Sequence, residues 1–121
     1  MNFYVTTQDN SIKKLSSLIL GDMVLCENGI YSPVLHIFLT ASYSTFCRLS
    51  NGITLYVPER MVLKTSKGLK HPELWDVLDI SKELTPQIIS LKKIDRIMFF
   101  HDILIEANMI TPEGIVFNYK M

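Results

Sequence analysis

Apolar and polar positions alternate along the last quarter of the chain. Over residues 99–106 the even-numbered side chains, beginning with Phe100, share one face of an extended chain, and the odd-numbered ones share the other. This period of two is typical of a β-strand. Residues 111–114, Thr-Pro-Glu-Gly, predict a β-turn because Pro presets φ and Gly supplies the left-handed corner. Residues 115–117 then return, so two strands around one turn are expected here.

Two Asn-Gly pairs punctuate the first half of the chain. Asn28-Gly29 and Asn51-Gly52 each lie between apolar runs, which is a strong signal for a β-hairpin. The expected strands are 19–26, 30–39, 43–49 and 53–57. Pro33 cannot donate a ladder hydrogen bond, so its strand is expected at an edge or with a bulge.

Shorter apolar runs complete the pattern. Further strands are predicted at 5–7, 61–63, 88–91 and 94–100, and spacing three at 12–18 fits one helical turn or a tight loop. Residues 72–84 fit a short helix that begins near Pro72, but a strand over 75–80 fits as well, and the two stay open. The sum is eight to ten short strands with at most one short helix, which indicates an all-β fold. A length of 121 residues suits one domain, 1–121.

The charge distribution narrows the classes of binding partner that are expected. Twelve cations balance twelve anions, and residues 60–96 carry a net charge of only +3. A nucleic-acid interface needs a clustered basic face, so nucleic acid is not expected. The rival hypothesis of a weak nucleic-acid-binding β-domain predicts steep salt dependence and rests on six cations: Lys64, Lys67, Lys70, Lys92, Lys93 and Arg96.

The remaining composition predicts no cofactor chemistry. Cys26 and Cys47 stand in apolar surroundings and are expected as reduced core thiols, and no spacing of His and Cys indicates a metal site. No apolar run approaches the ~20 residues of a membrane span, and no secretory signal is visible. We therefore expect an intracellular protein without metal, cofactor, membrane contact or small-molecule substrate.

Three blocks occur in an order that resembles the Hint domains, the family of inteins and hedgehog autoprocessing domains. Residues 15–24 are similar to the family pattern I-x-x-L-x-x-G-D-x-V, and the Asn-Gly hairpin follows as expected. Residues 51–63 lie where the family has a strand ending in T-P-x-H and an apolar triplet. Residues 101–106 and 114–116 match the closing pattern Y-D-L-x-V-E … G-I. The resemblance implies a horseshoe of short antiparallel strands with two pseudo-symmetric halves, for which 18–23 and 77–80 are candidate counterparts.

The resemblance also implies which residues would carry self-processing. The family needs an N-terminal Cys or Ser, a Thr and a His that polarise the scissile bond, and a closing His-Asn pair. Val57 stands at the Thr position and Arg60 at the His position, and neither can serve as a base. Asn108 and Phe117 replace the two later histidines, and the chain starts Met-Asn-Phe-Tyr. Asn118 alone matches, although Tyr119 follows it where splicing needs Cys, Ser or Thr.

The expected function is accordingly a catalytically inactive Hint-like scaffold or protein-interaction module. It would bind another protein or itself through an Ile/Leu/Phe-rich strand surface. Stand-alone degenerate copies suggest a phage or viral accessory or structural protein, placed in the host cytoplasm or the virion. The enzyme alternatives are residual C-terminal cleavage at Asn118 and a hydrolase that uses Cys26 or Cys47.

Overall fold

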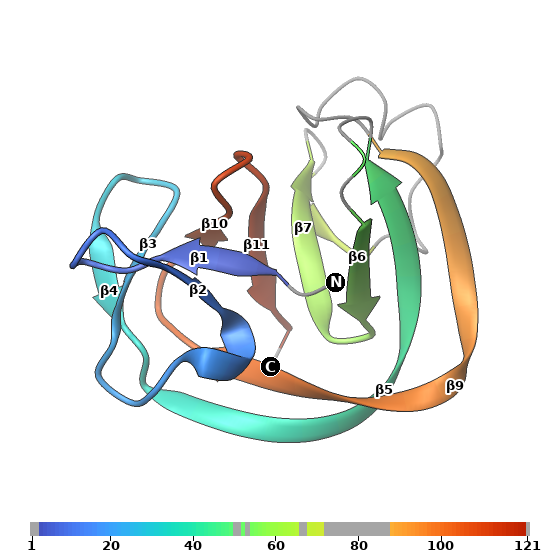
Figure 1. Ribbon diagram of the computed structural model, residues 1–121, viewed down its shortest axis with the longest axis horizontal. Coiled ribbons are helices and arrows are strands. Elements are labelled where there is room, and N and C mark those ends of the chain that lie inside the picture. The colour runs from blue at the N-terminus through green and yellow to red at the C-terminus, as the bar shows by residue number, and fades with distance from the viewer. Residues whose placement is uncertain (1–2, 50–51, 53, 66–67, 72–87, 121) are drawn as a thin grey trace.

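The residues that the structure describes form eleven strands and one short 3₁₀ helix (Figure 1). The structure is a computed structural model, and it describes residues 3–49, 52, 54–65, 68–71 and 88–120. In chain order the elements are β1 (Tyr4–Thr6), β2 (Ile12–Lys14), η1 (Leu15–Ser17), β3 (Met23–Leu25), β4 (Tyr31–Pro33), β5 (His36–Leu49), β6 (Thr54–Pro58), β7 (Met61–Thr65), β8 (Gly68–Lys70), β9 (Ile88–Leu104), β10 (Met109–Ile110) and β11 (Val116–Tyr119).

Two long strands give the molecule its outline. β5 and β9 pair antiparallel from His36 opposite Leu104 to Leu49 opposite Ile88, and β6 pairs with the other edge of β5. Figure 1 shows β5 and β9 bending together into an arc, with β6, β7, β10 and β11 inside it. The register shifts between Ser42 and Ser44, as a β-bulge does, and such a bulge bends its strand. The predicted all-β class and horseshoe outline are confirmed.

Both predicted Asn-Gly turns join antiparallel strands. Around the first turn, the Cys26 N–H donates to the Ile30 carbonyl at 3.0 Å and Gly29 has a φ of 78°. Around the second, the Gly52 N–H donates to the Leu49 carbonyl at 3.0 Å. Pro33 ends β4, whose partner among the described strands is β3 alone, so the predicted edge position is confirmed.

A four-stranded sheet in the order β10-β11-β7-β8 lies within the arc. The predicted turn at 111–114 joins β10 to β11, with the Thr111 N–H donating to the Ile115 carbonyl and the Gly114 N–H to the Thr111 carbonyl, both at 2.9 Å. Side chains on one face of this sheet are buried: Met61, Leu63, Met109, Phe117 and Tyr119. The opposite face, which we call the outer face, carries half-buried and exposed side chains, among them Val62, Lys64, Leu69 and Asn118.

Several predicted boundaries were wrong. Residues 30–39 are two strands, β4 and the start of β5, because Val34 turns away to exchange backbone hydrogen bonds with Asp22 and Gly21. Residues 43–49 continue β5, and 88–91, 94–100 and the strand predicted at 99–106 all belong to β9 as far as Leu104. Residues 12–18 hold β2 and η1. The open choice at 72–84, and with it the repeat at 77–80, lies outside the described residues.

The core includes both ends of the described chain. The rings of Phe3 and Phe117 pack with centroids 4.8 Å apart, and both side chains are buried. Val5, Val24, Ile103 and Phe117 all have relative exposures of 0%. The two ends are thus placed beside each other by apolar packing. Among the described residues, no helix has the length and apolar character needed to cross a membrane.

Candidate functional site

The structure brings two of the five predicted processing positions into contact. The Asn118 side-chain amide (Nδ2) donates to Asn108 Oδ1 at 3.1 Å, across the β10-β11 pair. Asn118 lies on β11 and Asn108 immediately precedes β10, so the hairpin itself sets their approach. Both side chains are half-buried on the outer face.

This contact belongs to a longer polar network that sequence patterns did not reveal. Asn108 Nδ2 donates to Glu27 Oε1 at 2.7 Å, and the Lys64 ammonium lies 2.6 Å from Glu27 Oε2. The Glu27 N–H also donates to the Asn108 carbonyl at 2.9 Å. The hydrogen bond from Lys64, and then that from Asn108, lowers the pKa of the Glu27 carboxyl. Glu27 therefore stays ionised and anchors the Asn108 amide from the β3-β4 turn.

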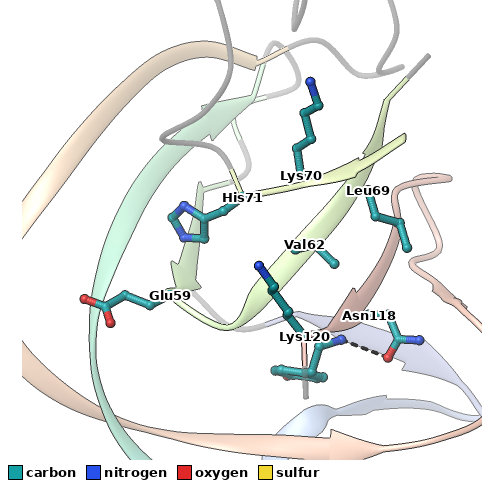
Figure 2. Close-up of a pocket in the computed structure, with 8 residues that line it drawn as sticks. Glu59, Val62, Leu69, Lys70, His71, Asn118 and Lys120 are labelled. Atoms are coloured by element: carbon teal, nitrogen blue, oxygen red, sulfur yellow. Dashed lines mark hydrogen bonds between the residues drawn. The ribbon is translucent and has the colours of Figure 1, made fainter. Parts of the chain in front are cut away.

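The other end of the Asn118 side chain is also engaged. Its Oδ1 accepts the Tyr119 N–H at 2.8 Å, as the dashed line in Figure 2 shows. The oxygen therefore faces the peptide bond that follows Asn118, while the nitrogen is directed to Asn108. Cyclisation of an Asn requires its side-chain nitrogen to attack its own carbonyl carbon, so this orientation is unproductive.

The side chains of the remaining three positions do not join this hydrogen-bond network. Val57 and Phe117 are buried with relative exposures of 0%, in β6 and β11, and their hydrocarbon side chains can neither donate nor accept a proton. Arg60 is exposed in the turn between β6 and β7, and its carbonyl accepts the Lys120 N–H at 2.6 Å. Arg60 thus holds the chain just after Asn118 through its backbone. Among the five positions, a side-chain hydrogen bond joins Asn118 to Asn108.

A buried carboxyl group lies on the inner side of the same region. Asp102 has a relative exposure of 2%, and its Oδ1 has no hydrogen-bond partner among the described residues. Burial raises the pKa of the Asp102 carboxyl, although a hydrogen bond from Thr40 and the charges of Arg60 and His101 lower it. An incompletely satisfied buried carboxyl is costly, and such groups are candidates for functional sites.

Tyr119 lies close to this carboxyl group. Its hydroxyl donates to the His101 carbonyl at 3.1 Å, and burial, followed by the charge of Asp102, raises the pKa of Tyr119. The sequence pattern predicts that His101 and Asp102 point to opposite faces of one strand, so they do not make a dyad by themselves. The pattern gave no sign that the Asp102 face is covered, since an alternating strand is expected to be solvated on one side.

A pocket adjoins Asn118 on the outer face (Figure 2). It has a volume of about 620 Å³ and is lined by Glu59, Val62, Leu69, Lys70, His71, Asn118, Tyr119 and Lys120. We call it the Asn118 pocket. β7, β8 and β11 supply its walls, so residues far apart in the sequence meet there. The sequence singled out Asn118 and Lys70 separately, but no pattern predicted that both would line one pocket.

Neither cysteine is suited to nucleophilic attack. Cys26 and Cys47 are free and buried, with relative exposures of 1% and 0%. Burial raises the pKa of Cys26, and it raises the pKa of Cys47 to about 12. Because the thiolate is the reactive form, both side chains behave as the core thiols that the sequence predicts.

The six cations of the nucleic-acid hypothesis are distributed over separate elements. Lys64 and Lys70 lie on β7 and β8, whereas Lys92, Lys93 and Arg96 lie on β9; Lys67 is outside the described residues. Lys64 is moreover paired with Glu27. Within the described ranges, no three His, Cys, Asp or Glu side chains gather closely enough to hold a metal ion.

Comparison with solved structures gives this arrangement a context. The chain is similar to the gp41-1 intein, with 18% identity, a TM-score of 0.71, and coverage of 97% of this chain and 94% of that one. It is similar to the MchDnaB-1 intein at 12% identity and a TM-score of 0.77, covering 97% and 96%. A DnaB intein from Synechocystis gives 12% identity and a TM-score of 0.75, covering 99% and 96%. No family model matches the sequence, and no curated protein matches it significantly.

These likenesses span nearly the whole chain and establish its fold. The protein has the Hint fold of the inteins, as the three sequence blocks predicted.

Proposed function

We propose that this intein-like domain has lost self-processing and acts as a scaffold or protein-interaction module. One observation carries the first half of the proposal. The Asn118 side chain is held at both ends, its nitrogen by Asn108 and its oxygen by the Tyr119 N–H. To cyclise, Asn118 would have to break both hydrogen bonds and rotate its amide.

At the positions that the family pattern uses for cleavage, this chain also lacks the required partners. A cyclising Asn needs a general acid for its leaving amine and donors for the developing oxyanion. In this chain a phenylalanine precedes Asn118, and Asn108 accepts from its amide instead of donating to the scissile carbonyl. The Val57 position supplies no hydroxyl. Each replacement removes one contribution that is ordinarily worth a factor of about 10² or more in rate.

Exposed hydrophobic side chains support the second half of the proposal. Where β5 and β9 cross the base of the arc, Ala41 pairs with Phe99. The neighbours of this pair on the same face are also exposed, at 66% for Leu39 and 59% for Ile97, and Phe99 itself is 73% exposed. We call Leu39, Ala41, Ile97 and Phe99 the outer apolar patch. Contiguous exposed apolar surface on a small protein marks an interaction site.

The proposed partner is another protein or a second copy of this chain. A role as a minor virion or assembly component in a phage or virus accords with such a patch. Sedimentation at increasing concentration, with Phe99→Ser and the control Lys14→Ser, tests self-association. An association that Phe99→Ser abolishes supports binding through the patch, whereas a monomer at all concentrations removes self-association and leaves a heterologous partner as the proposal.

Intact mass measured over several days tests the loss of processing. The account predicts an unchanged mass with and without added thiol. Loss of Tyr119, Lys120 and Met121 that Asn118→Ala prevents would establish the alternative, residual C-terminal cleavage. Loss of mass that persists in Asn118→Ala would indicate contaminating protease and would require a purer sample.

A further inference from the structure

The floor of the Asn118 pocket is apolar. The register places Asn118 opposite Val62, and Leu69 opposite Lys64, so these side chains share the outer face. Val62 and Leu69 both line the pocket, and Leu69 is 42% exposed although it is a large hydrophobe. An apolar group placed on this floor would remove that surface from water, with a gain of roughly 25 cal/mol per Å² buried.

The rim of the pocket is positively charged. Lys70 and Lys120 line it, but Figure 2 shows the Lys70 side chain directed away from the other labelled residues, so the charge facing the pocket is that of Lys120, whose ammonium has no ion-pair partner among the described residues. Figure 2 shows the Lys120 side chain extending in the direction of His71, while the Glu59 carboxylate points away from the other labelled residues. Glu59, the acid among the described lining residues, therefore does not neutralise the space in front of Lys120. Such a site attracts an anion that comes within hydrogen-bonding distance of the ammonium.

Size and chemistry together select a class of ligand. A volume of about 620 Å³ is that of a site for a small organic molecule or a short peptide and is far larger than one ion needs. An inorganic anion would use Lys120 and leave Val62 and Leu69 exposed to water. A group that carries a carboxylate next to a branched apolar side chain would satisfy both the rim and the floor.

We propose that the Asn118 pocket binds a protein segment through a carboxylate that adjoins an apolar side chain. The carboxylate pairs with Lys120, and the apolar side chain lies on Val62 and Leu69. A free C-terminal Leu or Val carries both groups on one residue and is the occupant assigned here, and an internal Glu beside Leu is an outcome of the test that would overturn this assignment. The inference rests on the proposed interaction role, because it names the chemistry of a partner, but it assigns a site separate from the outer apolar patch.

Amide chemical shifts of the ¹⁵N-labelled full chain test the site directly. The probes are acetyl-Gly-Leu with a free carboxylate, its C-terminal amide, acetyl-Glu-Leu-amide, and inorganic phosphate. We expect acetyl-Gly-Leu, with its free carboxylate, to shift the resonances of Val62, Leu69 and the Asn118 side-chain amide, and its uncharged amide to leave them in place. Tighter binding of acetyl-Glu-Leu-amide than of acetyl-Gly-Leu would overturn the assignment to a free C-terminus. Equal binding of the uncharged amide, phosphate binding as tight as the peptides, or no shift with any probe would each overturn the proposal.

Two substitutions test separately what the charged rim and the apolar floor contribute to peptide binding. Lys120→Gln keeps the backbone contact to Arg60 and should weaken peptide binding at least tenfold. Leu69→Ser should also weaken peptide binding at least tenfold, and it should preserve the fold because Leu69 is exposed. Lys14→Gln removes an equal charge from β2 and should leave binding unchanged. Unchanged affinity in Lys120→Gln would contradict the assignment. Mass spectra of the same samples distinguish a failure of the pocket proposal from a failure of the proposed function. An intact chain that binds no peptide refutes the pocket proposal alone.

Discussion

The two faces of β11 have opposite characters. Phe117 and Tyr119 point into the core and are almost fully buried, whereas Asn118 between them points to the outer face and joins a polar network. A Hint domain that processes itself would need reactive groups at both Phe117 and Asn118. Here the inward position contributes apolar packing, and the outward one contributes hydrogen bonds. Two neighbouring residues of β11 thus contribute to the structure in two different ways.

The largest effect is expected on the inward side. Phe117→Ala removes a side chain with 0% exposure that packs on Phe3, and such truncations cost about 3–5 kcal/mol of unfolding free energy. Urea denaturation of this variant beside Asn118→Ala measures the contrast between the faces. We expect Asn118→Ala to lose far less, and equal losses would remove the distinction.

Asp102→Asn is expected to raise the unfolding free energy, by less than Phe117→Ala lowers it. The folded-state pKa of Asp102 is raised by burial, so its charged form destabilises the fold. The penalty is absent below the unfolded pKa of about 3.9, grows as the pH rises through the folded pKa, and is complete above it. The variant should therefore be more stable than the parent at neutral pH by about 1–2 kcal/mol, the order of an unsatisfied buried polar group.

Thermal unfolding between pH 3 and pH 8 measures this difference. The gain from Asp102→Asn should shrink to nothing at the acid end, since the parent then carries a neutral carboxyl as well. A variant that is less stable than the parent at pH 7 would show that the Asp102 carboxylate is satisfied by its neighbours.

The smallest effect is expected on the outward network. Asn108→Ala breaks the links from Asn108 to both Glu27 and Asn118, at a cost of about 0.5–1.5 kcal/mol. The folded pKa of Glu27 is lowered, so its stabilisation is present above the unfolded pKa of about 4.3 and is lost as the pH falls through the folded value. Without Asn108 the folded pKa of Glu27 lies closer to the unfolded value, so the loss should be smaller and should be complete at a higher pH. Acid titration of unfolding measures the shift, and Lys64→Met, which removes the larger influence on Glu27, should shift it further.

Features encoded by neighbouring residues were predicted from the sequence. The Asn-Gly hairpins and the turn at 111–114 follow from backbone preferences of a few residues, and the three sequence blocks gave the fold. The extent of β5 and β9 did not follow, because a long bent pair is stabilised by its partner strand and tolerates a bulge at Ser42. From strand periodicity alone, such a pair is predicted as several separate short strands.

Features built from distant residues were not predicted. Glu27 lies 81 positions from Asn108, and no local pattern connects them. The burial of Asp102 depends on which elements cover that face of β9. The Asn118 pocket depends on β7, β8 and β11 meeting in one sheet. The sequence shows which residues stand at the positions where the resemblance implies reactive side chains, whereas the contacts that these residues make required the structure.

The measurement that bears most directly on the central claim is the intact mass of a restored variant beside the parent. Val57→Thr, Arg60→His and Phe117→His together return the side chains that the family pattern places there, and the parent keeps Asn118 in its network. We expect the parent mass to stay unchanged over days at neutral pH. Shedding of the three residues after Asn118 by the restored variant would not alter this expectation for the parent. Cleavage of the parent after Asn118, prevented by Asn118→Ala, would contradict it.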